Sequence, residues 1–234
     1  MEYFAAFLSI FMVNVVLSGD NAVVIALACR KLPPKQQKMA ILLGSGGAIL
    51  FRIILTVIIV YLLKIPFLQA VGGLLLVYIA VKLLKDEDAG EDVKSADNLA
   101  EAIKVIVVAD LIMSLDNTLA IAAVSKGNWT LLIIGLATSI PIIILCAQII
   151  MYMMKKFPII LYIGSGILGW TAGEMLVGDK KVLEYLHNNV AAGTVHIIDI
   201  AVPVVITAFV IIFGWWGNKR AKQEEIGHET NMVK

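Results

Sequence analysis

Seven long apolar segments follow one another along the chain, and short polar stretches separate them. The hydrocarbon core of a bilayer is about 30 Å thick, and a helix of ~20 mostly apolar residues crosses it. The segments therefore predict seven transmembrane helices and an all-α polytopic membrane protein. They cover about residues 4–29, 39–63, 67–84, 102–124, 131–154, 159–177 and 196–216.

Composition supports the same class of protein. Hydrophobic residues make up 60% of the 234 and charged residues 16%, with a mean hydropathy of +0.90, whereas soluble proteins average roughly 25% charged residues. The length predicts one transmembrane domain, residues 1–217, and a short polar tail, residues 218–234, that we expect to be disordered. The net charge of +1 argues against a nucleic-acid partner. The lipid bilayer is the expected surrounding, and nothing in the sequence specifies an oligomeric state.

Basic residues gather in particular turns, and this pattern predicts the orientation. They occur at residues 30–38, 155–156 and 219–222, after the first, fifth and seventh segments. Cytoplasmic loops carry an excess of Lys and Arg, so we expect the amino terminus outside and the carboxyl terminus in the cytoplasm of a plasma-membrane protein. The start M-E-Y-F lacks the features of a signal peptide, so the first segment should be kept. The polar stretches at residues 85–101 and 178–195 are expected to be loops.

Two of the apolar segments contain a similar string of polar residues. Residues 14–22 read N-V-V-L-S-G-D-N-A in the first segment, and residues 110–120 read D-L-I-M-S-L-D-N-T-L-A in the fourth. When the two strings are aligned, four polar positions coincide. The pairs are Asn14 with Asp110, Ser18 with Ser114, Asp20 with Asp116, and Asn21 with Asn117.

The two strings indicate an internal repeat of three helices. The first copy covers about residues 4–84 and the second about 102–177, and the remaining segments can also be aligned by glycines. With three helices per copy, the copies enter the membrane from opposite sides. We therefore expect a 3+3 inverted repeat plus a seventh helix, about residues 196–216, which is an architecture common among transporters. Gly19 is a candidate for a break in the first helix, as found at transporter substrate sites.

The paired strings place carboxylates inside the membrane. Asp20, Asp110 and Asp116 each cost about 2.5–3.5 kcal/mol on insertion scales, and such residues usually have a function and a partner. A divalent cation would relieve their mutual repulsion. The other donors are oxygens of amides and hydroxyls, from Asn14, Ser18, Asn21, Ser114 and Asn117, which suit Mg²⁺, Ca²⁺ or Mn²⁺.

The arrangement of these groups leaves alternatives open. In an ideal helix, Asp20 and Asp116 are each turned by about 100° from the face of their neighbouring polar residues. A structural ion pair between an Asp and Arg52 or Lys82 is the alternative to a cation site. Arg52 is either such a structural partner or a counter-ion that neutralises the empty site and moves away when metal binds. Glu174 is expected near the outer surface, as an interfacial charge or in a vestibule that attracts cations.

At the strings L-S-G-D-N, residues 17–21, and S-L-D-N, residues 114–117, the sequence resembles the TerC family of integral membrane proteins within the LysE transporter superfamily. The resemblance extends over all seven segments. It implies export of manganese or another divalent cation, metal supply to secreted or membrane enzymes, and a link to tellurium resistance. It also implies a metal-binding role for five residues, although many members carry an acid where this chain has Asn14. The five are Asp20, Asn21, Asp110, Asp116 and Asn117.

The leading hypothesis is a Mn²⁺ exporter that works by alternating access, with Mn²⁺ as bound substrate and Mg²⁺ or Ca²⁺ as alternatives. One alternative is an exporter of solutes or amino acids, in which the same polar groups bind an ammonium group. Another is an intramembrane aspartyl protease, but its G-x-G-D signature is absent because Leu17-Ser18 precede Gly19-Asp20. We therefore expect a transporter rather than an enzyme.

Overall fold

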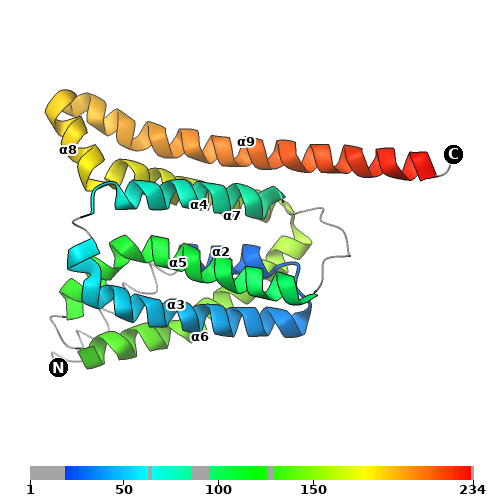
Figure 1. Ribbon diagram of the computed structural model, residues 1–234, viewed down its shortest axis with the longest axis horizontal. Coiled ribbons are helices and arrows are strands. Elements are labelled where there is room, and N and C mark those ends of the chain that lie inside the picture. Colours follow the sequence, from blue (N-terminus) through cyan, green and yellow to red (C-terminus); the bar gives the residue numbers. More distant parts are fainter. Residues whose placement is uncertain (1–18, 63–64, 86–94, 126–128, 233–234) are drawn as a thin grey trace.

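In the computed structural model, the described residues, 19–62, 65–85, 95–125 and 129–232, form helices joined by short turns and contain no strand. The prediction of an all-α protein is confirmed, and each predicted segment coincides at least in part with a helix (Figure 1). The helices are α2 (Gly19–Cys29), α3 (Pro34–Leu62), α4 (Leu68–Lys85), α5 (Ser95–Ser125), α6 (Trp129–Lys156), α7 (Ile159–Gly178), α8 (Lys180–Asn189) and α9 (Ala192–Met232).

Three of these helices contain stretches that are long and apolar enough to cross a membrane. The stretches are Pro34–Leu55 in α3, Ile159–Gly178 in α7 and Gly193–Gly217 in α9. Helix α2 and residues Leu68–Leu84 of α4 are apolar but shorter. Only 17% of the stretch in α9 is buried within the protein, so most of its apolar side chains are available to lipid. The structure therefore fits a helical membrane protein, while the number of seven crossings stays a prediction.

Three stretches that were predicted to lack regular structure are helical in part. Helix α8 lies within the predicted loop at residues 178–195, and α9 continues to Met232 through the predicted tail at residues 218–234. Ala, Lys, Arg, Gln and Glu, which favour helix, follow Trp216, so α9 does not end where its apolar stretch ends. Helix α5 likewise begins at Ser95, inside the predicted loop at residues 85–101.

Asp179 explains how α8 begins. Its buried carboxylate accepts a hydrogen bond from the Lys181 backbone N–H at 2.9 Å, which makes it the N-cap of α8. The other carboxylate oxygen accepts from the Ala70 backbone N–H at 3.3 Å, in the first turn of α4. One side chain therefore satisfies backbone donors at the start of two helices and ties α8 to α4.

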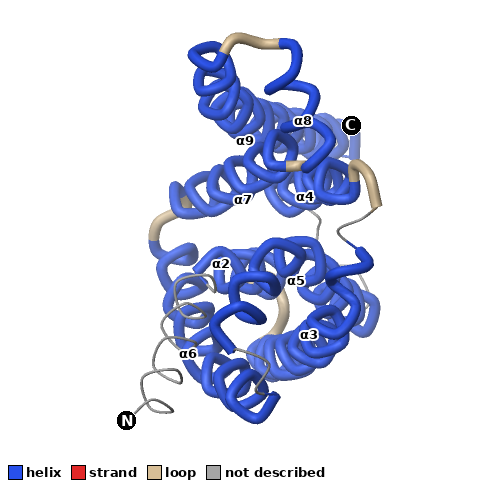
Figure 2. The backbone as a smooth tube through the Cα atoms, turned by 90° about the vertical axis from the view of Figure 1, so that its left-hand side faces the viewer, coloured by secondary structure: helices blue, strands red, loops and turns tan. Residues whose placement is uncertain are grey.

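The helices form two groups, which Figure 2 shows nearly end-on. In the first group, α2 packs on α5 and α6, and α3 packs on α5 and α6. In the second group, α4, α7 and α9 pack against one another. Contacts of α4 with α5 and of α2 with α7 join the groups. The two predicted repeats correspond to the triplets α2, α3, α4 and α5, α6, α7. When each helix is replaced by its counterpart (α2 by α5, α3 by α6, α4 by α7), the contacts named above among these six helices are exchanged with one another.

Glycines allow the helices to approach closely in both groups. A Cβ at Gly44 of α3 would lie 2.9 Å from the Ile106 side chain of α5, so the absence of a side chain at Gly44 allows α3 to pack closely on α5. In the second group, a Cβ at Gly73 of α4 would lie 2.7 Å from the Ala172 carbonyl oxygen of α7. A Cβ at Gly173 would meet the backbone of Pro203 in α9.

Candidate cation site between α2, α3 and α5

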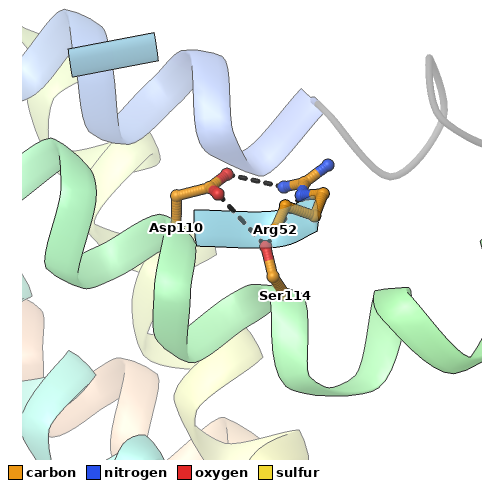
Figure 3. Close-up of polar contacts among 3 residues, drawn as sticks. All are labelled: Arg52, Asp110 and Ser114. Carbon is orange, nitrogen blue, oxygen red and sulfur yellow. Dashed lines mark hydrogen bonds and ion pairs between the residues drawn. The ribbon is translucent and has the colours of Figure 1, made fainter. Parts of the chain in front are cut away.

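A buried ion pair joins α3 to α5 (Figure 3). The Arg52 Nη2 atom donates to the Asp110 Oδ1 atom at 2.6 Å, and the Arg52 Nε atom donates to the Ser114 hydroxyl at 2.9 Å. Ser114 in turn donates to the Asp110 Oδ2 atom at 3.1 Å. Both oxygens of the carboxylate are therefore hydrogen-bonded within a closed triangle of three side chains.

Helical spacing and close packing bring these three side chains together. Asp110 and Ser114 are four residues apart on α5, so they share one face of the helix. Gly44 and Gly47 allow α3 to approach that helix, because a Cβ at Gly47 would lie only 3.2 Å from Val107. Arg52, two turns further along α3, then reaches across to the carboxylate.

The pair is almost removed from solvent. The Arg52 side chain is 3% exposed and the Asp110 side chain is 10% exposed. A buried charge without its counter-charge is strongly unfavourable, so each residue depends on the other in this conformation. The ion pair that the sequence allowed between an intramembrane Asp and Arg52 is therefore present. The other candidate cation, Lys82, pairs instead with Glu101 at the surface of α4 and α5.

A small cavity of about 20 Å³ lies beside the ion pair. This is slightly more than the ~10–15 Å³ needed to hold one water molecule. Four polar residues line it from three helices: Asn21 of α2, Ser45 and Arg52 of α3, and Asp110 of α5. The rest of the wall is aliphatic and comes from Val24, Ile25, Ala48, Ile49, Ile106 and Ile143.

Two of the polar side chains that line the cavity have unsatisfied atoms. Asn21 and Ser45 are each 3% exposed. Among the described residues, neither the two amide atoms of Asn21 nor the hydroxyl of Ser45 has a hydrogen-bond partner. Most buried polar atoms in proteins are hydrogen-bonded, and each exception calls for an explanation such as a bound ion or water. The cavity is therefore suited to bind one small polar ligand.

The structure brings together part of the predicted set of ligands. Asn21, Asp110, Ser114 and Arg52 lie at or beside the cavity. Asp20 does not line it, because α2 is helical from Gly19 and the offset of about 100° between Asp20 and Asn21 persists.

Asp20 is turned toward α7 instead. Thr171 and Glu174 of α7 are the side chains whose polar groups act on its carboxylate. Glu174 is exposed and accepts a hydrogen bond from the Trp170 indole at 2.8 Å. The two carboxylates of Asp20 and Glu174 thus lie on adjacent helices, outside the cavity.

The remaining predicted ligands are not described at the level of side chains. Asn14 and Ser18 lie outside the described residues. Asp116 and Asn117 belong to α5, beyond Ser114, but only their backbone is described. Among the residues whose side chains are described, no three or more His, Cys, Asp or Glu cluster in a way that would hold a metal ion. The described donors at the cavity are one carboxylate, one amide and one hydroxyl.

Ser45 is the residue of the cavity that the sequence analysis missed. Ser45 stands in the glycine-rich string G-S-G-G, residues 44–47, and precedes Arg52 by seven residues on the same helix. That spacing places the two on one face. A polar residue two turns from an intramembrane charge is therefore the signal that identifies it.

The fold and the cavity define a helical membrane protein with a small polar site buried between its helices. Residues 1–222 match the profile of the Integral membrane protein TerC family, and the chain belongs to this family.

Its relatives include several proteins of Bacillus subtilis (strain 168). The chain is 44% identical over 211 residues to the uncharacterized membrane protein YjbE, covering 90% of this chain and 94% of that protein. It is 25% identical over 251 residues to the uncharacterized membrane protein YkoY, covering 96% of this chain and 75% of the relative. It is 29% identical over 160 residues to the uncharacterized membrane protein YceF, covering 64% and 62% of the two chains. No solved structure matches the chain.

Proposed function

We propose that the protein is a divalent-cation transporter that exports Mn²⁺ and whose cargo binds at the cavity beside Asp110. The observation that carries the proposal is the pair of unsatisfied, buried side chains, Asn21 and Ser45, which line one small cavity with a carboxylate. Their donor atoms include oxygens, the ligand type that Mn²⁺, Mg²⁺ and Ca²⁺ prefer. Asp116 and Asn117 of the second polar string are the proposed further ligands, together with Asn14 and Ser18 of the first. Asp20 joins them in this proposal only when α2 turns or unwinds near Gly19, because in the present conformation it lies outside the cavity.

The proposed mechanism is alternating access of two inverted halves, residues 4–84 and 102–177. The contacts between helices support it, because α2 packs on α6 as α5 packs on α3. Such cross-packing is the pattern expected of two related triplets around a shared site. In this proposal seven helices cross the plasma membrane, with α9 as the seventh and the amino terminus outside.

The size of the cavity disfavours the export of solutes or amino acids, which was the first alternative to cation transport. A cavity of about 20 Å³ has room for an ion or a water molecule, but not for an amino acid. An aspartyl protease needs two carboxylates that share a proton. Among the described side chains, Asp110 is the single carboxylate lining the cavity, and it is paired with Arg52. Transport of a bare cation, rather than enzymatic hydrolysis, is therefore the function that we propose.

Transport assays in proteoliposomes test this proposal. Wild-type protein should move Mn²⁺, and parallel assays with Mg²⁺ and Ca²⁺, with and without a pH gradient, define the ion and the driving force. The variants Asp110→Asn, Asp116→Asn and Asp20→Asn should lose Mn²⁺ binding and efflux. Glu101→Gln is the matched control, because Glu101 is an exposed carboxylate on α5, and it should behave like wild type. Full efflux in all three Asp variants contradicts the proposal.

A further inference from the structure

The position of Arg52 determines how a cation can reach the Asp110 carboxylate. Its guanidinium lies 2.6 Å from the Asp110 Oδ1 atom, and Ser114 occupies the Oδ2 atom. A cation in the adjacent cavity would therefore find both oxygens of the carboxylate engaged. It would also face a fixed positive charge at close range, which is strongly repulsive in a site of low dielectric constant.

Binding of a cation to Asp110 thus requires that the guanidinium leaves. This movement does not require the helices to separate, because Arg carries its charge at the end of a long, flexible side chain. The same carboxylate is then neutralised by Arg52 in the empty site and by the cargo in the loaded site. In neither state is the Asp110 carboxylate buried without a positive charge beside it, an arrangement that would be costly.

The internal repeat indicates that helix packing alone does not require a charged side chain at position 52. Laying Gly44 on Gly135 is a shift of 91 residues, and the same shift lays Arg52 on Ile143. Ile143 lines the same cavity from α6. An aliphatic side chain therefore serves in the second half where the first half has a guanidinium. The charge of Arg52 is a feature of the site rather than of helix packing.

We propose that Arg52 is a tethered substitute for the cargo, which occupies Asp110 in the empty transporter and permits its return step. This inference rests on the proposed cation transport. A carrier exports net cargo only if it returns without cargo, whereas exchange of cargo across the membrane needs only the cargo-loaded form. Arg52 is thus a positioning and coupling residue: it competes with cargo for Asp110 and sustains net export, but exchange does not need it.

Two measurements on Arg52→Gln test the inference. Loss of the internal competitor should tighten Mn²⁺ binding by about three- to tenfold in titration calorimetry. Net Mn²⁺ efflux into Mn²⁺-free buffer should slow by about tenfold or more, because the empty carboxylate is then uncompensated. Exchange of radioactive Mn²⁺ for external Mn²⁺ should stay within about twofold of wild type. A purely structural role would instead weaken binding and slow both fluxes together.

Two further variants make the test decisive. Lys82→Gln removes a cation from the surface pair with Glu101 and should leave binding, net efflux and exchange unchanged. Arg52→Lys retains the charge but has no Nε donor for Ser114, so it should bind Mn²⁺ more tightly than wild type and retain part of the net efflux. Unchanged or weaker Mn²⁺ binding in both Arg52 variants, or net efflux equal to wild type in Arg52→Gln, overturns the inference. If wild-type protein neither binds nor exchanges Mn²⁺, the proposed function itself fails.

Discussion

The two groups of helices are held together in different ways. Between α2, α3 and α5, buried polar side chains line a small cavity within the apolar packing, and the ion pair of Arg52 with Asp110 crosses from α3 to α5. Between α4, α7 and α9, glycines bring backbones into direct contact, as at Gly73 and Gly173. A polar partner can be exchanged for a ligand, whereas a backbone packed against a backbone has no such substitute.

This difference suggests a division of labour. The first group has contacts that a cation can replace, so it is suited to bind and release cargo. The second group has close contacts that fix its helices relative to one another, so it is suited to serve as a frame. Substitutions in the two groups should therefore separate cargo binding from stability, and the following predictions test that separation.

Asp110→Asn should have the largest effect. A neutral amide removes the carboxylate charge that faces the buried guanidinium of Arg52, and removal of one partner of a buried ion pair typically costs about 3–5 kcal/mol. We expect a markedly lower midpoint of thermal unfolding in detergent, together with the loss of Mn²⁺ binding.

The double variant Asp110→Asn/Arg52→Gln is the control for this prediction. It removes both charges, so most of the lost thermal stability should return while Mn²⁺ binding stays absent. If Asp110→Asn unfolds at the wild-type temperature, the ion pair does not hold α3 to α5 as described.

Gly173→Ala should have the next largest effect, and it should act on stability alone. The new Cβ would collide with the backbone of Pro203 in α9, and such overpacking costs typically about 1–3 kcal/mol. Gly166→Ala is the matched control on the same helix, because its Cβ would make ordinary contacts at 3.5 Å or more. The thermal midpoint should fall for Gly173→Ala alone, with the Mn²⁺ affinity of both variants unchanged. A loss of Mn²⁺ affinity in Gly173→Ala would contradict the division of labour.

Much of the helical fold could be predicted from the sequence, because apolar segments of about 20 residues have few alternatives to a helix in a bilayer. Helix α8 could not, since it is short and polar and depends on the cap by Asp179, whose second bond to Ala70 is set by tertiary packing. The length of α9 was missed for a related reason. The end of an apolar stretch marks the membrane boundary, but helix formers carry α9 on to Met232.

The candidate site could be predicted only in part. The two polar strings identified Asn21, Asp110 and Ser114, and the charge of Arg52 was conspicuous in an apolar segment. The sequence did not determine which neighbour each would face. Asp20 is adjacent to Asn21 in the chain, yet it does not line the cavity and is influenced by Thr171 and Glu174 of α7 instead, because one step along a helix turns a side chain by about 100°.

Ser45→Ala should have the smallest effect, and it gives the most specific test of the cavity. Ser45 of α3 and Ser165 of α7 are both buried, and neither hydroxyl has a hydrogen-bond partner among the described residues. Only Ser45 lines the cavity. If its hydroxyl is a ligand of the cargo, Ser45→Ala should weaken Mn²⁺ affinity by about two- to tenfold, the equivalent of one hydrogen bond of about 0.5–1.5 kcal/mol. The thermal midpoint without Mn²⁺ should be unchanged or slightly higher, because no described partner is lost. Ser165→Ala should leave Mn²⁺ affinity unchanged, and an equal loss of affinity in the two variants would show that the effect does not arise at the cavity.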